Sequence, residues 1–284
     1  MKKEQGPTLR AQWLGQQLRE MREQASLTLK DVGDYISRTA STVSRIESGI
    51  LPARVPEVLA YLDICGVDDP HRRDGLRTMA QDVWQRGWWD GLKADVAGSL
   101  IDWIWLESRA TEIYSFQVSV PSGLLQTRDY AEAVIRAAHP DASEEQIARF
   151  VEIRMTRQGR LAEAEPLRLS TVIDEVALHR MIGGPNVVRA QINHLAEMAR
   201  RPHIDIMVLP ADVGAHASPN GSFDVFQMRP PYPYAGCVST PAGTVVVEGD
   251  EAEALVRTYD RLRDAALHKE SAVAFLSDLA KRLE

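Results

Sequence analysis

The sequence predicts two domains of different class, an N-terminal domain of about five helices and a larger C-terminal domain of mixed α+β structure. Residues 28–49 have the caps and apolar spacing of two short helices joined by a turn. From residue 112 onward, segments with helical spacing alternate with short apolar segments typical of strands. The length of 284 residues is sufficient for two separate cores.

The N-terminal domain is expected to begin with a helix over residues 8–25, where apolar residues recur every three or four positions. This helix is expected to pack behind the pair formed by residues 28–49. Beyond Gly49, prolines bracket a loop, and a further helix is expected to end near Gly66. These segments place the first domain at residues 1–68.

Residues 28–49 form the most informative stretch of the chain. Thr28 can cap a first helix, and small Gly33 lies on its apolar face, where a second helix can approach closely. Thr39 can cap that second helix, which Gly49 ends. The sequence therefore predicts two short helices joined by a tight turn.

The second of these helices points Val43 and Ile46 one way and mostly hydroxyl side chains and Arg45 the other way. Such a helix can enter the major groove of DNA, and Arg45 can reach either a guanine edge or a phosphate. The alternative is an amphipathic helical hairpin with polar residues outside. The residues expected to contact DNA are Thr28, Lys30, Arg38, Thr39, Ser41, Thr42, Ser44, Arg45 and Arg54.

Residues 41–49, STVSRIESG, resemble the end of the helix-turn-helix of the Xre and phage-repressor (lambda-repressor-like) family. The resemblance implies sequence-specific binding of double-stranded DNA. It also implies that Glu47 ties its helix to neighbouring helices.

Two departures from this family pattern affect the expected interface. Ser37 occupies the turn position usually given to Gly and is followed by Arg38, so the turn is expected to be less tight and to carry an extra phosphate contact. Ala40 occupies the place where phage repressors often have a base-reading Gln. Base recognition is therefore expected to depend on Ser41, Thr42 and Arg45.

The charge of the chain is divided unevenly. Residues 1–54 hold 9 Lys and Arg against 6 Asp and Glu, a balance of +3, and the rest of the chain carries −10. Only the N-terminal part suits phosphates, and its small excess predicts that tight operator binding requires two copies, as in a homodimer. A cytoplasmic protein, nucleoid-associated when bound to DNA, is expected because neither a signal peptide nor a membrane span is found.

The segment from residue 69 to residue 111 is expected to be a Trp-rich helical linker, because five of the six tryptophans lie between positions 84 and 105. Tryptophan supplies large buried area and is frequent at interfaces. A domain seam packed with large rings is favoured over an interface. Trp88 and Trp89 remain candidates for ligand or partner contacts.

The C-terminal domain is expected over residues 112–284, with helices outnumbering strands. Strands are expected at residues 112–120, 167–173, 204–209, 222–228 and 244–248. Helices are expected at residues 129–138, 143–161, 175–181 and 185–200, with two more between residues 250 and 284.

A second resemblance covers this domain. The segments VPSGLLQTRDYA (residues 120–131), VIDEVAL (172–178), IMVLP (206–210) and VVVE (245–248) resemble the C-terminal domain of unknown function in actinobacterial Xre-type regulators of the WhiJ-like group. The resemblance implies a transcription regulator of a filamentous actinomycete, often acting with a small partner protein encoded nearby. It implies no ligand.

No enzymatic activity, cofactor or metal is expected. Neither HExxH, GxSxG nor a phosphate-cradling Gly loop occurs. Asp174 and Glu175 can form a paired acid site, but acids at a helix start more commonly interact with the helix dipole. The histidines of this domain without metal-ligand spacing are His179, His194, His203 and His216.

Two features of the C-terminal domain leave alternatives open. Arg154 and Arg157, three apart on one helix, can bind an anionic ligand, although exposed ion pairs with Glu152 or Glu163 explain them more simply. The PSGLLQT turn can be purely architectural, or it can line a pocket with Gln126 as its polar contact.

The sequence thus predicts a dimeric, sequence-specific DNA-binding transcriptional regulator. Its C-terminal domain is expected to sense a small molecule or bind a small partner protein. The alternative is an antitoxin-like protein whose C-terminal domain sequesters a small partner and which regulates its own operon.

Overall fold

A computed structural model of the chain describes residues 6–92, 96, 98–240 and 243–283. The chain divides into two compact units. The first unit comprises Met1–Trp105 and Pro230–Tyr232, and the second comprises Leu106–Arg229 and Pro233–Glu284. The expected linker over residues 69–111 includes residues 93–95 and 97, which lie outside the described residues.

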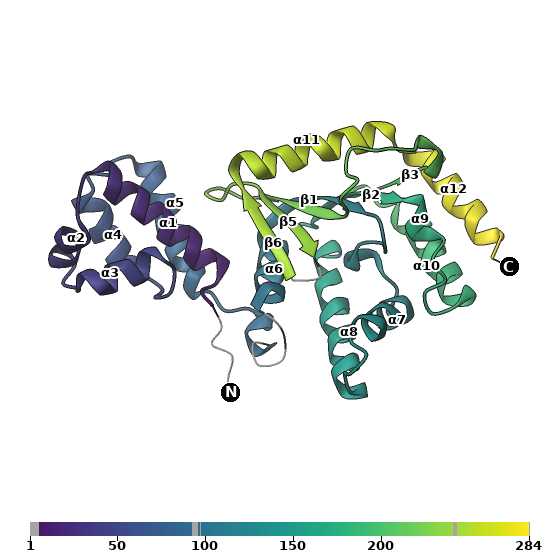
Figure 1. The fold of residues 1–284 in the computed structure, drawn as a ribbon, viewed down its shortest axis with the longest axis horizontal. Helices are drawn as coiled ribbons and strands as arrows, with labels where there is room; N and C mark the ends of the chain where they lie inside the picture. The colour runs from purple at the N-terminus through teal and green to yellow at the C-terminus, as the bar shows by residue number, and fades with distance from the viewer. Residues whose placement is uncertain (1–5, 93–95, 97, 241–242, 284) are drawn as a thin grey trace. The chain divides into compact units, whose positions relative to one another are not determined.

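The first unit has five helices up to residue 84, as predicted, but their distribution differs from the expected one. The fifth helix lies beyond residue 68, in the expected linker, and contacts the first and fourth helices. The helices are α1 (Leu9–Gln24), α2 (Leu29–Tyr35), α3 (Ala40–Glu47), α4 (Val55–Ile64) and α5 (Pro70–Trp84) (Figure 1). A 3-10 turn, η1 (Trp88–Leu92), and the first part of α6 (Gly98–Arg109) follow.

An aromatic cluster forms part of the core of this unit. The ring of Trp13 in α1 lies 5.7 Å from that of Trp105 and 5.5 Å from that of Tyr232. The Tyr232 hydroxyl donates a hydrogen bond to Asp82 in α5 at 2.9 Å. Ring packing of this kind adds to the stability gained from buried apolar area.

The second unit is built on a six-stranded sheet, so the α+β class predicted for the C-terminal domain is confirmed. The strand order is β3-β2-β1-β4-β5-β6, in which β1 is parallel to β2 and antiparallel to β4. The strands are β1 (Ala110–Gln117), β2 (Arg168–Asp174), β3 (Ile204–Leu209), β4 (Phe223–Met228), β5 (Ala235–Thr240) and β6 (Gly243–Glu248). The sequence did not predict β5.

Helices lie on both faces of this sheet. Tyr259 and Leu262 of α11 pack on one face, in a cluster with Phe116, Val172 and other apolar strand residues. Figure 1 shows α11 over this face and α7, α8 and α10 on the opposite side. The helices after α6 are α7 (Arg128–Ala138), α8 (Glu144–Gln158), α9 (Glu175–Leu178), α10 (Pro185–Met198), α11 (Gly249–Ala265) and α12 (Lys269–Lys281).

Candidate nucleic-acid interface

Two threonines fix the starts of α2 and α3, as predicted. The Thr28 hydroxyl donates to Asp31 at 2.6 Å and accepts from the Asp31 amide at 3.2 Å. The Thr39 hydroxyl accepts from the Thr42 amide at 3.1 Å. These hydroxyls satisfy amides that would otherwise be unpaired in the first helical turn.

The turn between α2 and α3 is tight, which corrects the expectation that a serine would loosen it. Ser37 adopts the left-handed conformation with φ of 56°, and the Arg38 amide donates to the Gly33 carbonyl at 2.8 Å. A Cβ on Gly33 would lie 2.7 Å from the Arg38 carbonyl oxygen. The close approach thus depends on glycine at position 33, while the side chain at position 37 is tolerated at some cost in strain.

A buried carboxylate anchors the end of α3, as the family resemblance implied for Glu47. Arg22 in α1 donates to Glu47 through two nitrogens, at 2.7 and 2.9 Å, and the Tyr61 hydroxyl in α4 donates at 2.5 Å. The hydrogen bond to Glu47 raises the pKa of Arg22. Burial and the same carboxylate raise the pKa of Tyr61.

The opposite face of α3 is open to solvent. Val43 and Ile46 are buried, whereas Ser41, Ser44 and Arg45 are exposed. None of these three exposed side chains has a side-chain hydrogen bond recorded with another described residue. The α3 helix therefore presents a solvent-exposed polar face and has its apolar face in the core.

The other predicted contact residues differ in how much of their polar surface is available. Thr42 is partly buried, and its hydroxyl lies 2.9 Å from that of Thr39. Lys30 is exposed on α2. Arg38 is exposed but donates to Glu57 in α4 at 2.6 and 2.8 Å. Partial burial tends to raise the pKa of Glu57. Hydrogen bonds from the Arg54 amide and from Arg38 outweigh burial and hold this pKa below its usual value.

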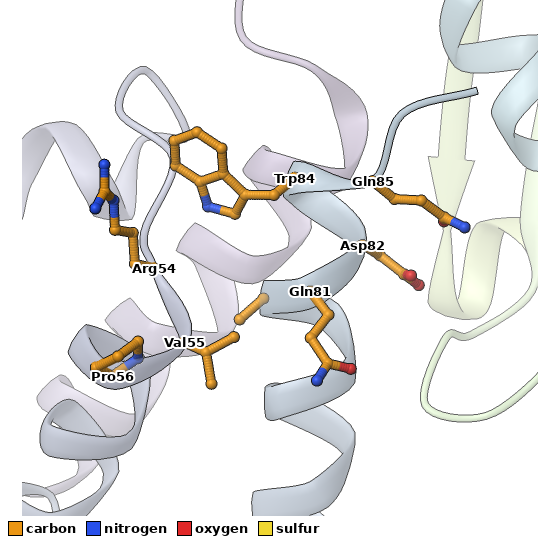
Figure 2. A pocket seen from close by; sticks show the side chains of 8 residues that line it. Arg54, Val55, Pro56, Gln81, Asp82, Trp84 and Gln85 are labelled. Carbon is orange, nitrogen blue, oxygen red and sulfur yellow. The ribbon is translucent and has the colours of Figure 1, made fainter. Parts of the chain in front are cut away.

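Arg54 lies just before α4 and next to Trp84. The sequence did not predict a role for Trp84 at the DNA interface. The Arg54 guanidinium carbon lies 5.7 Å from the centre of the Trp84 ring. The Trp84 indole nitrogen donates to the Ala53 carbonyl at 2.8 Å. Figure 2 shows both side chains, together with Asp82 and Gln85, lining a pocket. The volume of this pocket is about 660 Å³. The exposed Trp84 ring thus holds the loop that carries Arg54.

The other tryptophan candidates are divided between surface and interior. Trp88 is 44% exposed and Trp89 is 7% exposed. Their rings meet edge to face, with centres 6.1 Å apart. Trp88 alone of the pair thus presents a large face to solvent.

In the C-terminal unit, the prediction that Arg154 and Arg157 form exposed ion pairs is wrong. Arg157 pairs with buried Glu107 of α6, at 2.5 and 2.8 Å. Arg154 donates to the Gln126 side-chain oxygen at 2.6 Å. The nearby surface carboxylates have other partners, since Glu152 pairs with Arg128 and Glu163 with Arg160.

The PSGLLQT turn is tied down by hydrogen bonds from within the same unit. Gln126 is buried and donates to the Pro121 carbonyl at 2.8 Å. Gln158 in α8 donates to the carbonyls of Gly123 and Gln126 at 2.9 and 2.7 Å. The turn therefore has an architectural role that holds Gln126 beside Arg154.

The remaining polar candidates have structural partners. Asp174 accepts from the Val176 amide at 2.9 Å at the start of α9, and Glu175 accepts from the Ala211 amide at 2.8 Å. Neither cysteine forms a disulfide; Cys237 is buried and Cys65 is partly buried. Among the described residues, no group of three or more His, Cys, Asp or Glu side chains could hold a metal ion.

The first unit defines a class of protein. Its capped helices, tight turn and exposed α3 face have the geometry of a helix-turn-helix, and residues 13–75 match the family model described as a helix-turn-helix domain. This domain indicates DNA binding.

Residues 100–278 match the model described as "Domain of unknown function (DUF5753)", and the chain belongs to this family, because the match covers more than half of it. No curated protein and no solved structure matches the chain. No helix in the described ranges has the length and apolar character required to cross a membrane.

Proposed function

We propose that this chain is a sequence-specific DNA-binding transcriptional regulator of the Xre type. The observation that carries the proposal is the solvent-facing side of α3, where Ser41, Ser44 and Arg45 point away from a fully packed apolar side. Short hydroxyls and one arginine at this position can contact base edges in the major groove.

The regulator is proposed to bind DNA as a homodimer on repeated half-sites. One helix-turn-helix module with a balance of +3 over residues 1–54 has too few contacts for an operator affinity of about 10⁻⁸ M or tighter. Two modules would place their α3 helices in successive major grooves, at half-sites about 10 base pairs apart.

Genome-wide mapping of bound DNA, with the wild-type chain and with Arg45→Ala, tests this proposal. Arg45 forms no side-chain hydrogen bond or ion pair with another residue that the structure describes, so the substitution should leave the fold intact. The wild type should enrich a common motif that Arg45→Ala loses or relaxes. Arg19→Ala is the matched control, because it removes one exposed charge from α1 in the same unit. A wild-type map without a shared motif would overturn the proposal.

The C-terminal domain is proposed to give the regulator its input, by binding a small molecule or, as the resemblance to the WhiJ-like group implies, a small partner protein. The proposal gives the chain no catalytic role. A small-molecule input predicts a compound that raises the melting temperature and changes operator affinity together.

The charge of −10 beyond residue 54 favours a second candidate, an antitoxin-like protein that sequesters a small basic partner and regulates its own operon. Co-expression with a small protein encoded next to this chain tests this candidate. A stoichiometric complex that changes operator affinity is expected, and separate elution of the two proteins at low salt would contradict it.

A further inference from the structure

Arg154 of α8 carries a charge for which the surrounding protein provides little compensation. Its guanidinium group has five N–H donors, and within the described part of the chain it makes one side-chain hydrogen bond, to Gln126. The Gln126 oxygen belongs to an uncharged amide, so this hydrogen bond does not neutralise the charge of Arg154. Arg154 therefore differs from the arginines that pair with carboxylates elsewhere in this unit.

Arg157, one helical turn further along α8, provides the internal comparison. Its side chain is 11% exposed, and it meets the carboxylate of Glu107 through two nitrogens. The paired carboxylate outweighs the effect of burial and raises the pKa of Arg157. Arg157 is thus a satisfied structural cation.

Arg154 shows the opposite electrostatic balance. Burial, with the nearby charge of Arg157, lowers the pKa of Arg154 to about 10, and the more distant Glu107 only partly offsets this. The side chain nevertheless keeps some contact with solvent. A cation that is desolvated but still reached by solvent is well placed to bind an anion from outside.

The PSGLLQT turn places a residue without a side chain beside this cation. A Cβ on Gly123 would lie 3.6 Å from Arg154 Nε and 4.0 Å from Arg157 Nη2. The residue at this position therefore faces both guanidinium groups without a side chain of its own. The Gln158 hydrogen bonds hold the turn in place.

Buried polar groups lie on the neighbouring strands, and two of them, Ser115 and Asp224, already accept hydrogen bonds from Gln117. Ser115 in β1 pairs in register with Thr171 in β2 and Asp224 in β4, so the three side chains lie on one face of the sheet. This face is opposite the apolar cluster under α11. The Thr171 hydroxyl is buried and has no hydrogen-bond partner among the described residues. Asp224 interacts electrostatically with Arg157, which links this group to the α8 arginines.

We infer that Arg154 is the anion-binding residue of a small-molecule site in the C-terminal domain, beside the Gly123 turn. The ligand class is a small molecule with a carboxylate or phosphate group. The guanidinium would bind this group through its unused N–H donors, and the unpaired Thr171 hydroxyl would bind a polar group of the same ligand. This inference rests on the proposed binding role of the C-terminal domain and not on DNA binding.

Thermal unfolding of the full chain with sodium phosphate and with citrate, at ionic strength matched with sodium chloride, tests the inference. One of these probes should raise the wild-type Tm by about 3–6 °C at ten times its Kd. Arg154→Met should abolish the rise. Arg128→Met is the matched control, because it removes an exposed arginine paired with Glu152 from the preceding helix and should retain the rise.

The ligand-free Tm distinguishes a ligand-binding arginine from a structural one. Arg154→Met should leave this Tm unchanged within about 2 °C or raise it, because it removes a desolvated charge that has no direct carboxylate partner. Arg157→Met should lower it strongly, because Glu107 loses its bidentate partner. A large loss of Tm in Arg154→Met, an unchanged anion response in that variant, or no wild-type response to either probe would overturn the inference.

DNA binding measured on the same samples separates the two proposals. Loss of the anion response with sequence-specific DNA binding intact contradicts only the ligand site. An Arg154-dependent response in a chain that fails to select DNA contradicts only the DNA-binding proposal.

Discussion

A single carboxylate, that of Glu47, joins three helices of the N-terminal unit. It accepts from Arg22 of α1 and Tyr61 of α4 while it belongs to α3, and only 6% of its side chain is exposed. The position of the helix proposed to face DNA therefore depends on a residue on its opposite, buried side. Family resemblance identified Glu47 as structural, and its two partners, 25 and 14 positions away, confirm that role.

Glu47→Gln is expected to destabilise the N-terminal unit by about 3 kcal/mol, because it leaves a largely buried arginine without its anion. Urea unfolding of the purified chain measures the change. Glu23→Gln serves as the control, since the exposed Arg19–Glu23 pair is worth less than about 1 kcal/mol. Equal losses in the two variants would show that burial of the Glu47 pair is unimportant.

The left-handed conformation of Ser37 predicts that a substitution at this position can stabilise the N-terminal unit. Ser37→Gly should stabilise the unit by about 0.5–1 kcal/mol, because relief of backbone strain exceeds the added chain entropy of glycine in the unfolded state. Urea unfolding measures this change too, and operator affinity should stay the same. Gly33→Ala, which brings a Cβ against the Arg38 carbonyl, should instead destabilise the turn. A less stable Ser37→Gly chain contradicts the strain at this position.

Asp224 predicts a pH effect in the C-terminal unit. Burial raises its pKa from 3.8 to about 7, opposed by hydrogen bonds from Ser115 and Gln117 and by the charge of Arg157, and reinforced by Glu107. The folded chain therefore keeps this proton to higher pH than the unfolded chain. The stability that protonation provides is complete below about pH 4 and is lost as the pH rises through about 7.

Asp224→Asn should remove this dependence and make the chain more stable than the wild type at pH 8, by on the order of 2 kcal/mol. At pH 5 the two chains should be closer in stability. Denaturant unfolding across this pH range measures the difference. A constant difference between the two chains at every pH would contradict the raised pKa.

At the scale of elements, the loop before α4 and the end of α5 act together. Trp84 fixes the loop through its bond to Ala53 and lies beside the Arg54 guanidinium. If Arg54 contacts a phosphate, Arg54→Ala should lower DNA affinity and reduce the dependence of log affinity on log salt by about one unit.

Trp84→Leu should weaken DNA binding less than Arg54→Ala does and leave the salt dependence unchanged, because the charge remains while its position is less restricted. Trp84→Phe keeps a ring but loses the Ala53 bond, and it should fall between wild type and Trp84→Leu. Titrations of labelled DNA at several salt concentrations measure both quantities. Additive effects of Trp84→Leu and Arg54→Ala in the double variant would contradict a shared role.

Elements marked by local signals could be predicted from the sequence. Helices α2 and α3 begin directly after Thr28 and Thr39, as their caps indicated. Strand β5 was missed because it begins with Ala235 and Gly236, which carry little strand signal. Gly236 is suited to this position because a Cβ there would lie 2.6 Å from the Leu255 side chain.

Long-range polar partners could not be predicted in the same way. Arg157 finds Glu107 50 positions away, whereas sequence spacing pointed to carboxylates nearby. The group formed by Ser115, Thr171 and Asp224 depends on strand register, which no local pattern in these segments specifies. The proposed N-terminal interface could be predicted more completely from the sequence, because all its residues lie within one short stretch.

At the scale of the whole molecule, charge separates two tasks. Residues 1–54 carry +3 and hold the residues proposed to meet DNA, whereas the rest carries −10 and holds the proposed input site. A weakly basic DNA-binding domain binds random DNA poorly, so base contacts and a second copy of the domain must supply the specific affinity. The chain is therefore expected to bind its operator more tightly than random DNA, and the difference between the two affinities is expected to depend on α3.

The most direct measurement is the affinity of the chain for a duplex selected from a random pool and for a scrambled duplex of equal length, at one physiological salt concentration. The wild type should prefer the selected duplex by about 10³-fold or more. Arg45→Ala should reduce this ratio by about 5–150-fold, equivalent to a loss of about 1–3 kcal/mol at a base contact, while Arg19→Ala retains it. Equal wild-type affinity for the two duplexes would contradict sequence-specific DNA recognition by this chain.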